Sequence, residues 1–60
     1  MEIIRQINGK EYTITVEFEH RNVPSKRWVA YCKQVDLEEE VGANPNEAVR
    51  KLEIRIIKAS

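Results

Sequence analysis

The sequence predicts a small α+β domain, an antiparallel β-meander of four strands followed by one C-terminal helix packed on one face of the sheet. Three observations lead to this prediction. A turn signal stands at Asn8-Gly9, apolar and polar residues alternate over residues 12–18, and a helix-initiation signal begins at Asn44. Short connections favour strands that are neighbours in sequence order, and a helix is needed to cover the apolar face of such a sheet.

The pair Asn8-Gly9 predicts a β-hairpin. Both central residues of a type I′ turn have positive φ, which Asn followed by Gly tolerates best. With a two-residue turn, a first strand over residues 2–7 pairs with the next strand so that Ile3 faces Ile14.

Alternation in the second strand predicts a sheet with one apolar face and one face in water. The apolar face is expected to carry Tyr12, Ile14, Val16 and Phe18. The face in water is expected to carry Glu11, Thr13, Thr15, Glu17 and Glu19.

Two more strands are expected after a loop over residues 20–26, in which Pro24 ends the strand ladder. Residues 27–33 predict a third strand that is apolar on both faces, as in a central strand or one whose outer face meets a partner. A turn near residues 34–36 leads into a short edge strand over residues 37–41, where a run of glutamates discourages stray pairing. The third strand places Trp28, Ala30 and Cys32 on one face, and Val29 and Tyr31 on the other.

A helix is predicted from Asn44 to about Ala59. Asn44 is a good N-cap, Pro45 fits the first helical position, and Glu47 stands where a capping box has its acidic residue. At about 100° per residue, one stripe faces the core. This stripe contains Ala48, Val49, Leu52, Ile56 and Ala59, with Ile57 at its rim and Ile54 on the opposite side.

Three segments resemble the HicB-like antitoxin family: residues 12–18 (YTITVEF), residues 28–32 (WVAYC) and residues 42–48 (GANPNEA). Members typically show an extended strand, a strand of the W/Y-V-A type, and a Gly-x-Thr-x-x-Glu-Ala turn into a helix. The chain departs from the family twice. Residues 33–37 (KQVDL) stand where the family has Pro-Asp-Leu-Pro-Gly, and Asn44 replaces the capping Thr.

The resemblance implies a partial RNase H fold without catalytic carboxylates, and a non-enzymatic protein that binds and blocks HicA, a small basic toxin that cleaves mRNA. We expect inhibition by occlusion of the partner's active surface, through Glu17, Glu19, Val29 and Tyr31. One alternative is a phage or mobile-element inhibitor of a host defence nuclease, and a second is an RNA-binding domain.

Composition and charge restrict the possible function, location and oligomeric state of the protein. The formal net charge is zero, whereas nucleic-acid binders usually carry a basic patch. No apolar run reaches the roughly 20 residues that span a bilayer, and no secretory signal is recognisable, so we expect a single cytoplasmic domain over residues 1–60. A chain this short is marginally stable alone. Exposed apolar residues on the helix, Ile54 and Ile57, therefore predict a homodimer.

Residues that carry chemistry in enzymes are better explained structurally in this sequence. Cys32 and His20 are too few for a structural zinc site, which needs four ligands, and no cofactor is expected. Glu17, Glu19 and Asp36 are more readily solvated acids than a two-metal site. Trp28 and Tyr31 could stack on RNA bases, but they are predicted to point to opposite faces.

Overall fold

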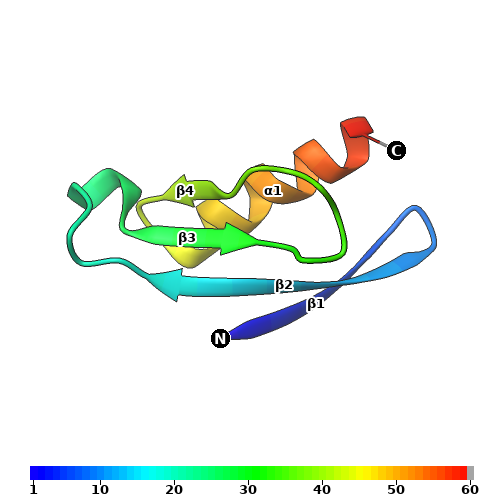
Figure 1. The fold of residues 1–60 in the computed structure, drawn as a ribbon, viewed down its shortest axis with the longest axis horizontal. Coiled ribbons are helices and arrows are strands. Elements are labelled where there is room, and N and C mark those ends of the chain that lie inside the picture. The colour runs from blue at the N-terminus through cyan, green and yellow to red at the C-terminus, as the bar shows by residue number, and fades with distance from the viewer. Residues whose placement is uncertain (60) are drawn as a thin grey trace.

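The computed structural model describes residues 1–59 and confirms the predicted fold class, with one antiparallel sheet and one helix against it (Figure 1). The sheet order is β1-β2-β3-β4, so the strands are neighbours in sequence order. The elements are β1 (Glu2–Ile7), β2 (Lys10–Phe18), a 3₁₀ turn η1 (Pro24–Lys26), β3 (Trp28–Tyr31), β4 (Glu40–Gly42) and α1 (Pro45–Ala59).

The hairpin between β1 and β2 forms as predicted. Asn8 and Gly9 have φ values of 53° and 78°, both in the left-handed region that a type I′ turn requires. Ile3 faces Ile14 in the register of the two strands. The turn therefore sets which side chains of β1 and β2 share a face.

The core lies between α1 and one face of the sheet. Burial of these apolar side chains supplies the main stabilisation of the fold. The sheet contributes Ile7, Tyr12, Ile14, Val16, Ala30 and Cys32, and the helix contributes Ala48, Val49, Leu52 and Ile56. We call the opposite face of the sheet, which α1 does not cover, the outer face.

Two residues predicted for the core are exposed. Phe18 is 53% exposed because its row of the sheet, with Trp28 and Gly42, lies where α1 only begins. Its ring packs edge-on against Trp28 with the ring centroids 5.1 Å apart. Apart from Ala59, the helical stripe is buried as predicted. Ala59 is exposed because the last turn of α1 extends past the ends of β3 and β4 (Figure 1).

Strands β3 and β4 are shorter than predicted. After Cys32 the chain turns away, and the side chain of Gln34 takes the place of a backbone partner for β2. Its Oε1 accepts a hydrogen bond from the Thr13 amide at 2.6 Å, and its Nε2 donates to the Glu11 carbonyl at 3.2 Å. Val35 and Leu37 pack against the core, so the chain reaches the sheet again only at Glu40.

The helix begins where the sequence predicts. Oδ1 of Asn44 accepts a hydrogen bond from the amide of Glu47 at 2.8 Å, which satisfies one of the unpaired donors of the first turn. The carboxylate of Glu47 forms an ion pair with Lys51 at 3.3 Å. Over the part of the chain that the structure describes, no helix is long and apolar enough to cross a membrane.

Candidate functional site

A hollow of about 400 Å³ opens at one end of the sheet, where β2 ends and β3 begins. We call it the acidic hollow, because three of the side chains around it are glutamates. Its lining residues are Glu17, Phe18, Glu19, Asn22, Val29 and Glu39.

One apolar residue that lines the hollow, Val29, lies on the outer face of the sheet. Val29 of β3 stands opposite Glu17 of β2 in the sheet register. Side chains alternate along a strand, and the neighbour of Val29, Ala30, faces the helix, so Val29 and Glu17 face outward. Val29 is nevertheless only 8% exposed, whereas Glu17 is exposed. A covered valine therefore lies beside an open carboxylate on this face.

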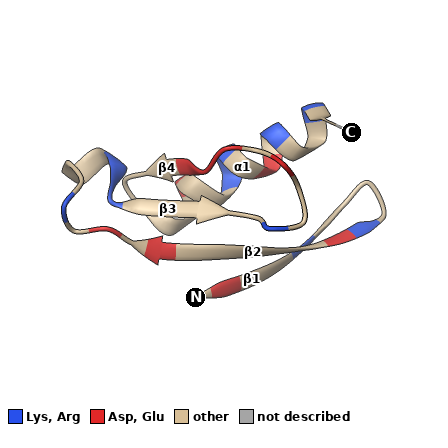
Figure 2. Ribbon diagram, in the orientation of Figure 1, with Lys and Arg blue, Asp and Glu red and all other residues tan. Residues whose placement is uncertain are grey.

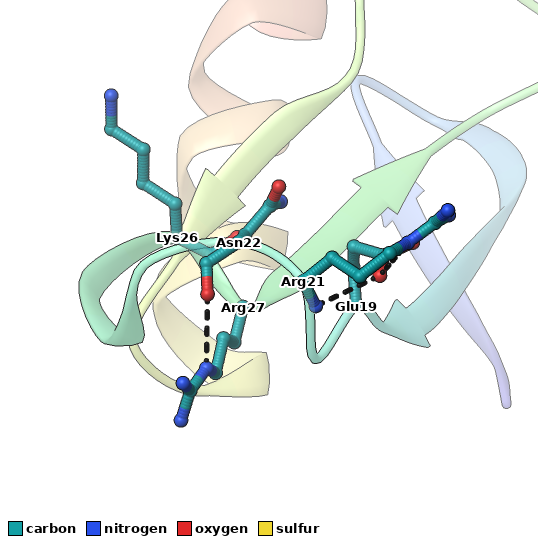
Figure 3. Close-up of polar contacts among 5 residues, drawn as sticks. All are labelled: Glu19, Arg21, Asn22, Lys26 and Arg27. Carbon is teal, nitrogen blue, oxygen red and sulfur yellow. Dashed lines mark hydrogen bonds and ion pairs between the residues drawn. The ribbon is translucent and has the colours of Figure 1, made fainter.

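Glu19 is fixed at the rim by Arg21. The Nε and Nη2 atoms of Arg21 donate to the two carboxylate oxygens of Glu19 at 3.0 Å each, and the Arg21 amide adds a third hydrogen bond at 3.0 Å (Figure 3). These bonds stabilise the carboxylate form and lower the pKa of Glu19 from 4.5 to about 2. Glu19 therefore stays charged at any physiological pH.

The loop that carries Glu19 and Asn22 is held by its own polar contacts. The Glu19 amide donates to the Arg27 carbonyl at 2.6 Å. Nε of Arg27 donates to the Asn22 carbonyl at 3.0 Å (Figure 3). The side-chain amide of Asn22 donates to the Lys26 carbonyl at 2.9 Å. This wall of the hollow is thus formed before any partner arrives, which reduces the ordering cost of binding.

Charge is unevenly distributed although its sum is zero. Figure 2 shows acidic residues at the end of β2 and directly before β4, whereas α1 carries several basic residues. Of the charges that line the hollow, Glu17, Glu19 and Glu39 are all negative, and Arg21 pairs with one of them. Within residues 1–59, no group of three or more His, Cys, Asp or Glu side chains is placed to hold a metal ion.

The structure brings three of the four predicted contact residues together. Glu17, Glu19 and Val29 all line the acidic hollow, whereas Tyr31 lies opposite Thr15, one outward position further along β3. Glu11 shares the outer face but stands six positions from Glu17 on the same strand, about 20 Å away.

One glutamate of the predicted edge strand lies on the side of the sheet that faces the helix. Glu40 stands opposite Ala30, which faces the helix, and its carboxylate accepts a hydrogen bond from Nη1 of Arg55 at 2.8 Å. β4 starts at Glu40 rather than at Leu37, where the sequence predicts its start. The chain before it is irregular, and there the two-residue alternation of a strand does not apply.

Sequence reasoning missed Asn22 and Glu39 as lining residues. Glu39 belonged to a predicted edge strand, and Asn22 to a loop without a recognisable motif.

The other residues considered in the sequence analysis do not line the acidic hollow. Ile54 and Ile57 are 44% and 50% exposed on α1, as predicted, while His20 is exposed in the loop after β2. Cys32 is buried in the core, where it acts as a small apolar side chain, and its Sγ lies 3.8 Å from Oε1 of Gln34.

Comparison of the chain with protein-family models, with curated proteins and with solved structures finds no match, and the resemblance to HicB-like antitoxins stays a prediction.

Proposed function

We propose that the chain is a non-enzymatic binding protein that inhibits a basic partner protein by covering its active surface, with a HicA-type mRNA-cleaving toxin as the leading partner. The observation that carries the proposal is the acidic hollow. Glu17, Glu19 and Glu39 surround a covered Val29 on the face of the sheet that α1 leaves open.

The charge of the hollow supports a basic partner. Enzymes that act on RNA present cationic surfaces to phosphate, and such surfaces attract a cluster of carboxylates. The charges of Glu17 and Glu39 would guide encounter and orientation, because charged rims chiefly affect association rate and specificity. Val29 would contribute a small apolar area to the lining that the partner covers.

The two alternative functions differ in the molecule that would bind at the acidic hollow. An inhibitor of a host defence nuclease would use the same acidic surface, since that partner also handles nucleic acid. Direct RNA binding is disfavoured because phosphates would approach three carboxylates. A cytoplasmic location and self-association remain part of the proposal, and Ile54 and Ile57, from which self-association was predicted, are exposed on α1.

The test compares two variants with the same charge change on the same strand. Glu17→Lys alters the hollow, whereas Glu11→Lys alters the outer face about 20 Å away. Each purified protein is titrated into an RNA-cleavage assay with a HicA-type toxin, and partners retained from the native host are identified by mass spectrometry. Glu17→Lys is expected to weaken inhibition about tenfold or more, because it places like charges together.

Glu11→Lys should inhibit like the unaltered protein. Equal inhibition by the unaltered protein and both variants would mean that the hollow is not the contact surface. Absence of inhibition, with no small basic protein retained from the host, would reject the proposed function. A salt-dependent gel shift with RNA would instead favour the RNA-binding alternative.

A further inference from the structure

The two edges of the sheet differ in how well they are protected. At the β4 edge, the strand spans only Glu40–Gly42, and Nζ of Lys51 donates to the carbonyl of Val41 at 3.1 Å. Glu40 is also held by Arg55. Short length and charge discourage another strand from pairing there.

The β1 edge is open. β1 spans Glu2–Ile7, twice the length of β4, and contains neither a proline nor a bulge in its ladder with β2. Ile4, at its centre, is 60% exposed on the outer face. An exposed edge of this kind is a template for a further strand.

The hairpin determines which backbone groups of β1 point away from β2. Met1 and Val16 exchange both of their backbone hydrogen bonds, at 2.7 Å and 3.0 Å. Pairs alternate along an antiparallel ladder, so the odd-numbered residues of β1 bond to β2 and the even-numbered residues point outward. The outward amides and carbonyls belong to Glu2, Ile4 and Gln6.

We propose that a second copy of this chain pairs antiparallel with the β1 edge, centred on Ile4, to give a symmetric dimer with one continuous sheet. In this register Ile4 faces Ile4 of the second copy, and Glu2 faces Gln6. Each facing pair exchanges amide-to-carbonyl hydrogen bonds. The apolar side chains of the two Ile4 residues cover each other on the outer face.

Other registers are less favourable. Shifting the centre to Arg5 brings two guanidinium groups together, and centring on Glu2 brings two carboxylates together. Like charges directly opposite each other destabilise a sheet. The register centred on Ile4 pairs residues 2–6 of β1 and opposes no like charges.

One existing contact must adjust. Nη1 of Arg5 donates to the outward carbonyl of Ile4 at 3.4 Å, a long hydrogen bond. Its Nε keeps a shorter ion pair with Glu53 at 2.8 Å. A carbonyl oxygen has two lone pairs, so an amide of the second copy can be accepted without loss of the ion pair.

The helix is a poorer surface for self-association. Ile54 lies three or four residues from Arg50, Lys51 and Lys58, so a two-fold contact there would bring cationic side chains together. Pairing at the β1 edge should also stop at two copies. Pairing at β1 uses the only open edge that we find in residues 1–59, and the protected β4 edge does not extend the sheet into a fibre.

The experiment has two parts. Sedimentation over a concentration series should show a dimer, and Ile4→Pro should weaken it about tenfold or more because it removes an outward amide that β2 does not use. Ile4→Val keeps the amide and a branched apolar side chain, and should remain dimeric. Circular dichroism checks that each variant is folded.

Cysteine cross-linking tests the register even if the proline variant fails to fold. In a Cys32→Ala background, Ile4→Cys should form a covalent dimer with oxidised glutathione. Glu2→Cys should not, because its counterpart lies about 13 Å further along the strand, beyond the reach of a disulfide. A protein that stays monomeric at high concentration, or cross-links through Ile54→Cys and not Ile4→Cys, would overturn the proposal.

Discussion

Gly42 lies directly against Glu47, at the point where the sheet passes into the helix. A Cβ atom added to Gly42 would stand 2.9 Å from Cβ and Cγ of Glu47 and 2.8 Å from the amide nitrogen of Ala48. These separations are shorter than any tolerated carbon contact. The first turn of α1 can therefore approach β4 only because residue 42 has no side chain.

Gly42→Ala is accordingly expected to destabilise the protein by about 1–3 kcal/mol, as overpacking of a close contact does. The clash involves the backbone nitrogen of Ala48, which cannot rotate away as a flexible side chain could. Urea unfolding measures the loss. Ala43→Ser, at the exposed neighbouring position, should change the free energy of unfolding by less than about 0.5 kcal/mol.

The N-cap gives a second prediction. Asn44→Ala removes the acceptor for the Glu47 amide and should lower the free energy of unfolding by about 1 kcal/mol. Asn44→Asp keeps a side-chain oxygen at the same position and adds a negative charge at the positive end of the helix dipole, so it should retain stability. Equal losses in both variants would show that the cap is not the source of the effect.

Local rules explain most of what the sequence predicted correctly. The Asn8-Gly9 turn, the alternation in β2 and the Asn44 cap each depend on a few neighbouring residues, and all three form as expected. Phe18 was misjudged because alternation gives the face of a side chain and not the extent of the helix above it.

The acidic hollow was predictable only in part, because it combines residues from different segments. Glu17 and Val29 followed from strand alternation and the expected meander. Glu39 depended on how the chain travels from Cys32 back to β4. That path is set by the packing of Leu37 on the core, a tertiary contact without a local signal.

The pKa of Glu19 predicts a specific pH response. Its carboxylate is favoured in the folded protein, where the pKa is about 2 instead of 4.5. Stabilisation by the Arg21 contact is therefore fully present above pH 4.5 and is lost as the pH falls toward 2. Carboxyl NMR titration should give a midpoint near 2 for Glu19, and Arg21→Gln should move it back toward 4.5. An unchanged midpoint in that variant would exclude Arg21 as the cause.

The side chain of Gln34 completes the hydrogen-bond ladder of β2 after β3 has ended. It accepts from the Thr13 amide and donates to the Glu11 carbonyl, as the backbone of a paired strand would. Gln34→Ala should therefore cost about 1 kcal/mol and accelerate hydrogen exchange at the Thr13 amide. Gln34→Glu keeps the acceptor and loses the donor, so Thr13 should remain more protected than in the alanine variant. Gln6→Ala, on the exposed β1 edge, is the control, and similar exchange at Thr13 in all of these proteins would refute the role of Gln34.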